Sequence, residues 1–280
     1  MIAVALSLLS AVAYGLSDFV GGVLSKRASP WSVALVGQLA GAVLVLALTL
    51  VTSGTPTTAD VGWAVVAGIG NGLGTAFLYR GFASGRMGVV APVSGVGAAL
   101  VPVAVGLLTG ERPAALVWVG IAAALPGIWL VAREPVSHDL TGPRAATGLV
   151  DGVLAGLGFG SLFAALAQIP EEAGFVPLAL NQLVAGVVIV VAAVLLREPW
   201  LPRSRYAAAG VSTGALGTLA TGAFLLASQQ GLLTVTSVLA SLYPAVTVVL
   251  AATVLREHVH RAQAAGLVLC GVAVALVAAG

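Results

Sequence analysis

The sequence predicts an all-α integral membrane protein with ten transmembrane helices, built as two inverted repeats of five helices. The first observation is composition: 59% of the residues are hydrophobic and 8% are charged, whereas about a quarter of a soluble domain is charged. The second is that the apolar residues form ten runs, each near the roughly 20 residues that cross a bilayer. The third is a weak internal repeat between the two halves of the chain.

The expected membrane segments follow one another along the chain with short loops between them. They are 2–24, 32–52, 61–80, 87–108, 113–132, 146–168, 175–196, 206–229, 232–254 and 261–279. Because the runs are continuous and do not alternate every second residue, they indicate helices and not a membrane barrel. Lys26 and Arg27 follow the first segment and no basic residue precedes it, so we expect a retained helix and not a cleaved signal. The single cysteine, Cys270, lies in the tenth segment, where we expect it to serve packing.

The basic residues predict which loops face the cytoplasm. Eleven of the twelve Lys and Arg residues fall in or beside the loops after segments one, three, five, seven and nine, and only Arg112 falls on the other side. By the positive-inside rule the first set of loops is cytoplasmic, which places the N- and C-termini outside the cytoplasm. We therefore expect a multi-pass protein of the cytoplasmic membrane, surrounded by the lipid bilayer. The dispersed basic residues give no indication of nucleic-acid binding.

Two lone glutamates, each at the end of an apolar run, mark the repeat. Glu111 stands in LLTGERP, and Glu257 follows it by 146 residues in TVLREHV. The same shift superposes 74–133 on 220–279 without gaps. Because five segments are an odd number, the second copy lies upside down in the bilayer, an arrangement found in many secondary transporters. We expect a first repeat over 1–134, a cytoplasmic linker over 135–145 and a second, inverted repeat over 146–280.

Two longer runs carry a family resemblance. They are PVAVGLLTGERPAALVWVG from Pro102 and PAVTVVLAATVLREHVHRAQAAG from Pro244. In each run an apolar helix leads to a glutamate and then to a helix with an early glycine. This pattern, repeated in register, resembles the EamA family of the drug/metabolite transporter superfamily. The resemblance implies ten helices, a central cavity lined mainly by the first four helices of each half, more peripheral fifth helices, and movement of small polar or amphipathic metabolites, often outward.

Polar and aromatic side chains inside the segments are the candidate substrate ligands. Residues spaced by three or four share one helix face, and an amide in lipid must face protein or water. Such an amide either bonds a neighbouring helix or contacts substrate. Pro244 frees a backbone carbonyl one turn earlier, at Ala240, for a binding site or a kink. The expected cavity residues are Tyr14, Ser17, Asp18, Gln38, Asn71, Phe159, Asn181, Gln182 and Tyr243.

Asp18 is the only carboxylate well inside an expected helix, where an acidic residue costs about 2.5–3.5 kcal/mol on insertion scales. That cost favours a functional use, and because removal from water favours the neutral carboxyl, Asp18 is the candidate for proton coupling. The alternative is an interfacial ion pair with Lys26 or Arg27. The aligned position in the second repeat is Phe163, so uncoupled, facilitated transport also stays open.

Glu111 and Glu257 are predicted to cap helices or to act as gates. Glu111 precedes Pro113 at the expected start of a helix, where a carboxylate meets the positive end of the helix dipole and proline suits the first position. Glu257 precedes the tenth segment in the same way, on the other side of the bilayer. A hydrocarbon core of roughly 30 Å separates the pair, which excludes a catalytic dyad. Each glutamate either caps its own helix or also bonds a neighbouring helix when its side is closed.

Two other functions have weaker support. Residues 210–214, GVSTG, match the G-x-S-x-G pattern of serine hydrolases. A nucleophilic Ser212 needs a base, however, and the three histidines, His138, His258 and His260, lie in expected loops. A lipid-headgroup flippase needs basic groups near mid-bilayer to hold a phosphate, and none stands there. The glycines of 68–74 lack nucleotide-loop spacing and, at intervals of four, predict close helix packing.

The function most consistent with these features is secondary transport. We expect a transporter, and not an enzyme, that exports a small metabolite, amino acid or drug-like molecule by alternating access about a midplane cavity. The sequence predicts no cofactor and no metal site. Because the two repeats are fused, a monomer can close its own cavity, so a homodimer is allowed but not required.

Overall fold

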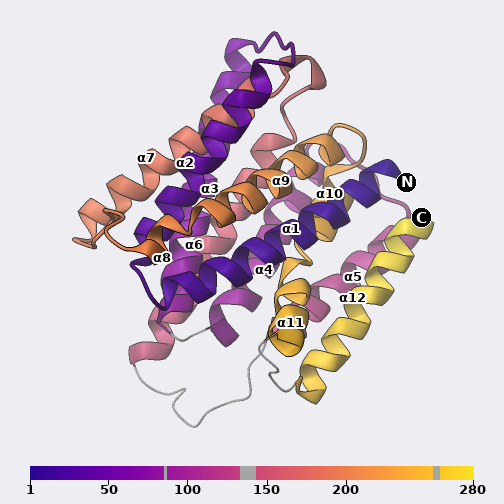
Figure 1. Cartoon of the computed structure of the whole chain (residues 1–280). Helices are drawn as coiled ribbons and strands as arrows, with labels where there is room; N and C mark the ends of the chain where they lie inside the picture. The colour runs from indigo at the N-terminus through magenta and orange to yellow at the C-terminus, as the bar shows by residue number, and fades with distance from the viewer. Residues whose placement is uncertain (85–86, 133–142, 255–258) are drawn as a thin grey trace.

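The computed structural model describes residues 1–84, 87–132, 143–254 and 259–280, and every regular element in these ranges is helical (Figure 1). The expected all-α class is therefore confirmed. The helices are α1 (Ile2–Ser25), α2 (Pro30–Thr49), α3 (Thr58–Ala83), α4 (Met87–Leu108), α5 (Ala115–Ala132), α6 (Pro143–Leu166), the single 3₁₀ turn η1 (Glu171–Ala173), α7 (Val176–Leu195), α8 (Arg205–Ala208), α9 (Val211–Ser228), α10 (Leu233–Ala240), α11 (Tyr243–Val254) and α12 (Arg261–Ala279).

Eight spans among the described residues are long and apolar enough to cross a membrane. Two further apolar stretches, Val93–Leu108 in α4 and Ala115–Val131 in α5, are shorter. Each of the ten expected segments thus coincides with a helix or a pair of helices. The multi-pass membrane character is supported, while the count of ten crossings stays a prediction.

Local sequence signals explain where the third segment begins and how far it extends. Thr57 and Asp60 form a capping box: the Asp60 N–H donates to the Thr57 hydroxyl at 3.3 Å, and the Thr57 N–H donates to the Asp60 carboxylate at 2.7 Å. This reciprocal pair satisfies free amides of the first turn. The helix also continues beyond residue 80 to Ala83. Arg80, which we expected at the cytoplasmic edge, therefore lies within the last turn of α3.

The ninth expected segment is broken in the middle. α10 ends at Ala240 and α11 begins at Tyr243, with Ser241 and Leu242 between them. Pro244 has no N–H to continue the hydrogen-bond ladder, and its ring clashes with the preceding turn. The interruption predicted at Pro244 is thus present. The eighth expected segment is divided in a similar way, into the single turn α8 and the longer helix α9.

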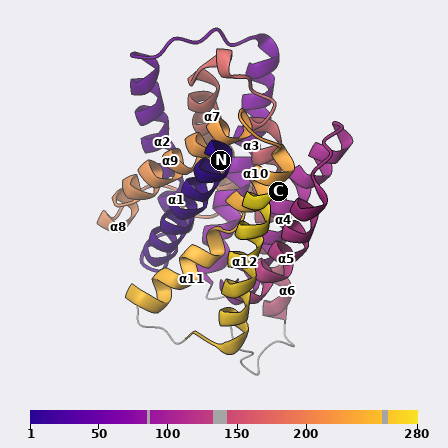
Figure 2. The same ribbon diagram turned by 90° about the vertical axis from the view of Figure 1, so that its right-hand side faces the viewer.

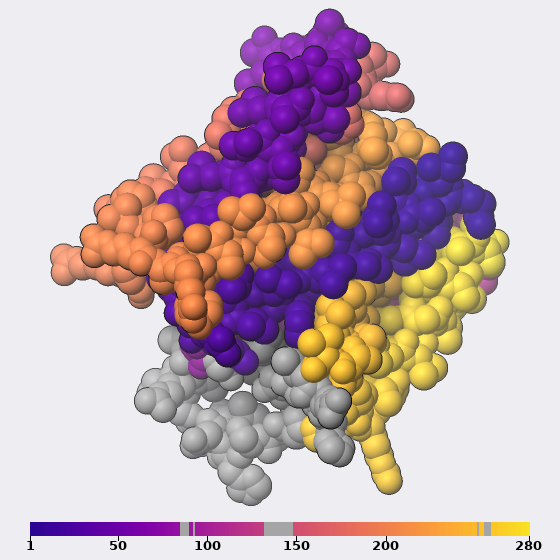
Figure 3. All heavy atoms as spheres, viewed as in Figure 1, coloured from indigo at the N-terminus to yellow at the C-terminus, as the bar shows by residue number. Residues whose placement is uncertain are grey.

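The two halves of the chain exchange their first helices. α1 packs against α9, α10 and α11 of the second half, while α6 packs against α3 and α4 of the first half. In the space-filling view α1, in indigo, runs between α9 on one side and α11 and α12 on the other (Figure 3). α5 and α12, the last helix of each half, lie side by side at the edge of the bundle (Figure 2). Every one of these contacts has its counterpart in the other half.

Loops that the charge pattern assigns to one side of the membrane also contact one another. The Thr55 N–H, between α2 and α3, donates to the carbonyl of Glu172 in η1 at 2.8 Å. At the opposite end of the bundle, the Ser29 hydroxyl donates to the carbonyl of Pro199, which joins the α1–α2 loop to the α7–α8 loop. Both contacts agree with the expected alternation of loops between two sides.

Glycine faces allow the central helices to approach closely. A Cβ at Gly70 would lie 2.5 Å from the carbonyl oxygen of Gly158 in α6, and one at Gly68 would lie 2.7 Å from the carbonyl oxygen of Asn181 in α7. α3 therefore presents two different small-residue faces to two helices of the other half. The glycine run of α3 thus makes the close helix contacts predicted from its spacing of four, as a packing seam or as a sliding surface. Gly214 of α9 meets the backbone of Gly37 in α2 in the same manner.

Candidate functional site

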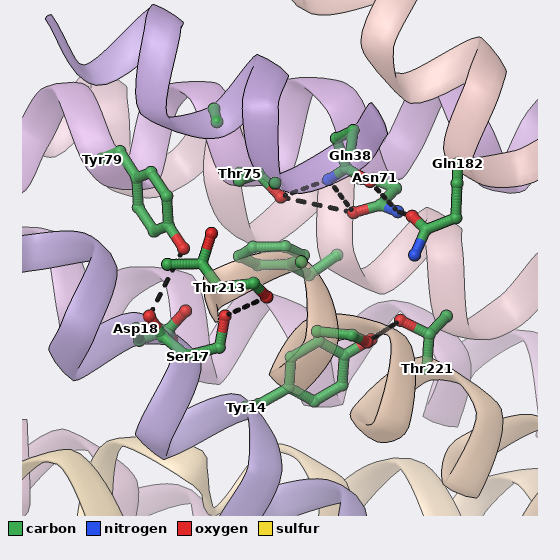
Figure 4. Close-up of a pocket in the computed structure, with 15 residues that line it drawn as sticks. Tyr14, Ser17, Asp18, Gln38, Asn71, Thr75, Tyr79, Gln182, Thr213 and Thr221 are labelled. Atoms are coloured by element: carbon green, nitrogen blue, oxygen red, sulfur yellow. Dashed lines mark hydrogen bonds between the residues drawn. The ribbon is translucent and has the colours of Figure 1, made fainter. Parts of the chain in front are cut away.

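A polar cavity lies where six helices from both halves meet. It is narrow and partly open: the space that a water molecule can occupy is about 30 Å³. Seven of the nine expected ligands line it, from α1, α2, α3, α6 and α7, and α9 completes the wall (Figure 4). The lining residues are Tyr14, Ser17, Asp18, Ala34, Gly37, Gln38, Asn71, Thr75, Tyr79, Phe159, Gln182, Thr213, Gly214, Gly217 and Thr221. The sequence positions chosen separately on five helices thus converge on one space.

Buried amides form one wall of the cavity. Asn71 of α3 is central: its Nδ2 donates to Gln38 Oε1 at 3.3 Å and to Gln182 Oε1 at 3.0 Å. Gln38 Nε2 donates back to Asn71 Oδ1 at 3.2 Å. The amides therefore serve interhelical bonding between α2, α3 and α7, the first of the two roles considered for them, and they face the cavity as well. Amides paired in this way avoid the cost of an unsatisfied polar group in lipid.

Asn181 lies behind this wall and does not line the cavity. Its side chain is fully buried, and its Oδ1 accepts a long hydrogen bond of 3.5 Å from Asn71. Its Nδ2 has no hydrogen-bond partner in the described part of the chain. Asn181 therefore supports the amide wall from outside, in contrast to its expected place among the cavity-lining residues.

Aromatic rings form the second wall. Tyr14 of α1 and Phe159 of α6, which the repeat aligns with each other, have ring centroids 6.4 Å apart. Tyr243 of α11 stands 6.2 Å from Tyr14 and 6.3 Å from Phe159. It does not line the main cavity but a second, closely packed hollow without room for a water molecule, shared with Tyr14, Asp18, Phe159 and Phe163. The Tyr243 hydroxyl forms a 2.7 Å hydrogen bond with Ser94 of α4.

Asp18 is buried, with 5% of its surface exposed, and it lines both the main cavity and the smaller hollow. The expected alternative, an ion pair with Lys26 or Arg27, is not formed: the one ion pair among the described residues joins other side chains. Arg27 instead lies over the ring of Tyr206, with the guanidinium carbon 5.4 Å from the ring centroid. Asp18 therefore faces the interior of the bundle and not the interface.

A second acidic residue lies inside the bundle, so the expectation that Asp18 is the only one was wrong. Asp151 of α6 has 4% of its side-chain surface exposed and forms an ion pair with Arg80 of α3. Its Oδ1 accepts a hydrogen bond of 2.9 Å from Arg80 Nε. The Arg80 guanidinium also lies over the Phe77 ring, 4.5 Å from its centroid. The signal was available in the sequence, because Asp151 is the sixth residue of the segment expected over 146–168.

Three threonines and a tyrosine of the cavity were not expected from the sequence. Tyr14 shares a 3.2 Å hydrogen bond with Thr221, and the Ser17 hydroxyl donates to the carbonyl oxygen of Thr213 at 3.2 Å. Thr75 and Thr221 are aligned by the shift of 146 residues, and this alignment was the sequence feature that could have identified them as cavity residues. The fourth residue is Tyr79, whose hydroxyl donates to the carbonyl of Ser17 at 3.4 Å. Because threonine is common in apolar helices, a threonine in a membrane segment does not by itself indicate a cavity residue.

Glu111 does not cap its own helix. α5 begins only at Ala115, and the Glu111 carboxylate instead accepts the backbone N–H groups of Leu233 at 2.5 Å and Thr234 at 2.9 Å. These amides open α10, a helix of the other half. Gly110, with φ of +99°, turns the chain between α4 and Glu111. The carboxylate therefore links two helices that belong to different halves.

Glu257 lies outside the described residues. Its helix, α12, begins at Arg261 with His260 at the N-cap, and the His260 N–H donates to the side chain of Gln263 at 3.0 Å. The first turn of α12 is thus capped by His260 and Gln263. Whether Glu257 bonds another helix stays a prediction.

The hydrolase pattern at 210–214 has a structural explanation. Ser212 is exposed and donates its hydroxyl to the carbonyl of Ala209 at 2.7 Å. The two glycines of the pattern pack against α2, where a Cβ at Gly210 would lie 2.7 Å from the carbonyl of Val33. Of the three histidines, His260 is the N-cap of α12, and His138 and His258 lie outside the described residues.

Comparison with known proteins agrees with this geometry. A model of the EamA-like transporter family matches residues 1–133 and 146–279. No curated protein sequence matches the chain. A solved structure described only as "Crystal structure of protein" superposes with a TM-score of 0.65 at 18% sequence identity, covering 95% of this chain and 96% of its own, which shows a shared fold. The chain therefore belongs to the EamA-like transporter family, a family of membrane transporters in the drug/metabolite transporter superfamily.

Proposed function

We propose that this protein is a secondary transporter that exports a small metabolite, amino acid or drug-like molecule by alternating access. The observation that carries the proposal is the polar cavity, whose walls come from both halves and combine amides, aromatic rings and one carboxylate. A mixed wall of this kind suits a small amphipathic molecule. Its position between two interlocked halves matches the inverted-repeat transporters, which bind substrate near the membrane midplane.

The exchange of first helices defines the units that move in this mechanism. One unit consists of α1 with α9, α10 and α11, and the other of α6 with α3 and α4, because the first helix of each half packs against these helices of the other half. The Arg80–Asp151 ion pair lies within the second unit and holds α3 to α6. The Glu111 bonds to α10 connect the two units. We therefore assign a clamp role to the ion pair and a gate role to Glu111.

The proposed orientation follows from the charge bias of the loops. The loops after the first, third, fifth, seventh and ninth expected segments face the cytoplasm, and both termini of this cytoplasmic-membrane protein lie on the opposite side. The contacts between loops of the same side support this alternation. A reporter active only in the cytoplasm, fused after Gly280, is expected to stay inactive, and an active reporter would overturn the orientation.

Proton coupling through Asp18 is the proposed driving force. Asp18 lines the cavity, where a change between buried and water-exposed states alters the cost of its charge. The test is transport in proteoliposomes over a panel of amino acids, nucleosides and lipophilic cations, each at two pH gradients. Wild-type flux is expected to follow the pH gradient, and Asp18→Asn is expected to lose that dependence.

Asp60→Asn is the matched control for this test, because Asp60 is buried in the cap of α3 and does not line the cavity. Wild-type flux that does not depend on the pH gradient would identify an uncoupled facilitator, the alternative function. Absence of flux for every compound would contradict the transporter proposal itself. Movement of lipid headgroups alone would assign the cavity to a flippase.

A further inference from the structure

The turn between α1 and α2 meets α8 of the other half at the surface of the bundle, away from the cavity. α8 contacts both α1 and α2, and in Figure 1 it lies beside the turn that joins them. The Ser29 hydroxyl donates to the carbonyl of Pro199 at this junction. Because the two segments are held together in this way, the charged side chains that they carry share one surface.

Two arginines at this junction lie against one tyrosine ring. The guanidinium carbon of Arg27, in the turn after α1, lies 5.4 Å from the centroid of the Tyr206 ring. The guanidinium carbon of Arg205 lies 5.1 Å from the same centroid, and its Nη2 donates to the Tyr206 hydroxyl at 3.2 Å. Each contact is a cation–π interaction and is favourable by itself. The ring therefore brings two positive charges, one from each half of the chain, into one small area.

No carboxylate of the described residues neutralises these two charges. The one ion pair in that part of the chain joins Arg80 to Asp151. Arg27 and Arg205 are both exposed. Like charges at a protein surface repel one another over roughly the Debye length of 8–10 Å. The pair of arginines is therefore more stable when an anion lies between them.

The residues near these arginines in the chain are also basic. Over 26–29 and 197–206 the sequence has five basic residues, all exposed, and a single acidic residue, Glu198. Arg197 ends α7 with φ of +58°, a left-handed conformation that glycine or asparagine usually adopts after a helix. The junction therefore has an excess of positive charge. We call the following residues the basic patch: Lys26, Arg27, Arg197, Arg203, Arg205 and Tyr206.

Apolar side chains adjoin the basic patch and indicate contact with the membrane. Leu195 and Leu196, at the end of α7, are 77% and 45% exposed, and Leu201 is 47% exposed. Trp200 is half-buried beside them. Tryptophan and tyrosine concentrate at the level of the lipid headgroups. Exposed leucines next to basic groups fit a molecule that has both an anionic head and acyl chains.

We infer that the basic patch is a binding site for the phosphate group of an anionic phospholipid, of which phosphatidylglycerol is the simplest probe. Guanidinium groups bind phosphate oxygens through charge-assisted hydrogen bonds. A phosphate between Arg27 and Arg205 replaces their repulsion by attraction and ties the turn after α1 to α8. The site lies outside the cavity, and the inference does not depend on the proposed transport.

The test compares two lipids that have the same acyl chains and a phosphate group but differ in net charge. Full-length protein in detergent is titrated with dioctanoyl phosphatidylglycerol or dioctanoyl phosphatidylcholine, and native mass spectrometry counts the bound lipids. We expect phosphatidylglycerol to bind at least about tenfold more tightly, because several basic residues attract its net negative charge. Equal affinity, or no binding of phosphatidylglycerol, would overturn the inference.

Variants locate the preference at the basic patch. The double variant Arg27→Gln with Arg205→Gln is expected to reduce the preference for phosphatidylglycerol at least about fivefold. Arg27→Lys with Arg205→Lys keeps both charges and is expected to keep a preference, which separates loss of charge from misfolding. The matched control, Arg112→Gln with Arg261→Gln, removes two exposed arginines outside the patch and is expected to change the preference less than about twofold. An equal loss in the control would show diffuse attraction and contradict a site.

A soluble phosphate ester separates a lipid site from a site for a free phosphate. Glycerol 3-phosphate has a phosphate group but no acyl chains. We expect it not to displace phosphatidylglycerol at millimolar concentration, because the exposed leucines contribute to binding of the lipid. Displacement at micromolar concentration would assign the patch to a soluble phosphate and overturn the assignment to a lipid.

Discussion

Substitution of Glu111 by Gln tests whether the contact with α10 works as a gate. The carboxylate accepts the N–H groups of Leu233 and Thr234, the first two residues of α10. Gly106 leaves the space for it, since a Cβ there would lie 2.5 Å from Glu111 Oε2. Glutamine has nearly the same shape but one acceptor oxygen and no charge. The substitution therefore removes one hydrogen bond and weakens the other without a change in packing.

The magnitude follows from these two bonds. A hydrogen bond to a charged group contributes about 1.5–3 kcal/mol, and the helix N-terminus adds a favourable dipole interaction of about 0.3–1 kcal/mol. Because Glu111 is half-buried, we expect the substitution to weaken the contact with α10 by about 2 kcal/mol, near the lower end of these values. A difference of 1.4 kcal/mol changes an equilibrium constant tenfold. We therefore expect the fraction of molecules in which the Glu111–α10 contact is open to rise by roughly 30-fold.

Hydrogen–deuterium exchange of a peptide covering 230–240 measures this opening directly. The amides of Leu233 and Thr234 are expected to exchange faster in Glu111→Gln, while amides of α3 keep their wild-type rates. Transport measured in both directions is expected to change unequally, because the contact closes only one side. Glu171→Gln, the same change at an exposed residue of η1, is the control.

Two results would refute the gate. Unchanged hydrogen–deuterium exchange at the start of α10 in Glu111→Gln would show that the contact between Glu111 and α10 does not stabilise the closed state. Lower thermal stability with equal loss of flux in both directions would reduce Glu111 to a structural cap of α10.

The remaining predictions concern packing and the alternative function. Arg80→Ala leaves Asp151 buried without its partner, and removal of one member of such a pair costs about 3 kcal/mol; thermal unfolding in detergent is expected to show the loss, and a double variant with Asp151→Asn should recover part of it. Gly70→Ala forces α3 away from α6 and is expected to destabilise by about 1–3 kcal/mol, whereas Gly62→Ala, with no atom within 4 Å of the new Cβ, should unfold like the wild type. Ser212→Ala is expected to leave flux unchanged, and reaction of Ser212 with an active-site serine reagent would revive the hydrolase.

The candidate site was largely predictable because polar residues are rare in this sequence. Membrane helices tolerate an amide or acid only where it faces protein or water, so Gln38, Asn71, Gln182 and Asp18 could be selected from composition alone. The helix period placed Ser17 and Asp18 on one face with Tyr14. Each of these residues lines the cavity in the folded chain.

Other members were hidden by ordinary chemistry. Thr75 and Thr213 resemble the many small residues that fill membrane helices, since a threonine hydroxyl can bond its own helix backbone, as the hydroxyl of Thr213 does with Gly210. Asn181 satisfies every criterion that selected Gln182, its neighbour, but successive residues of a helix point about 100° apart, and only one of the two reaches the cavity.

The sequence by itself determined the all-helical membrane class, the family and most of the polar cavity wall, because burial in lipid restricts both backbone and side chains so severely. Only the tertiary structure decided which helices share a unit and what Glu111 bonds. The distance along the chain from Glu111 to Leu233 is 122 residues, and no local rule connects them. The contact exists because α4 packs beside α10, which follows from the mutual fit of two halves and not from any pattern within one.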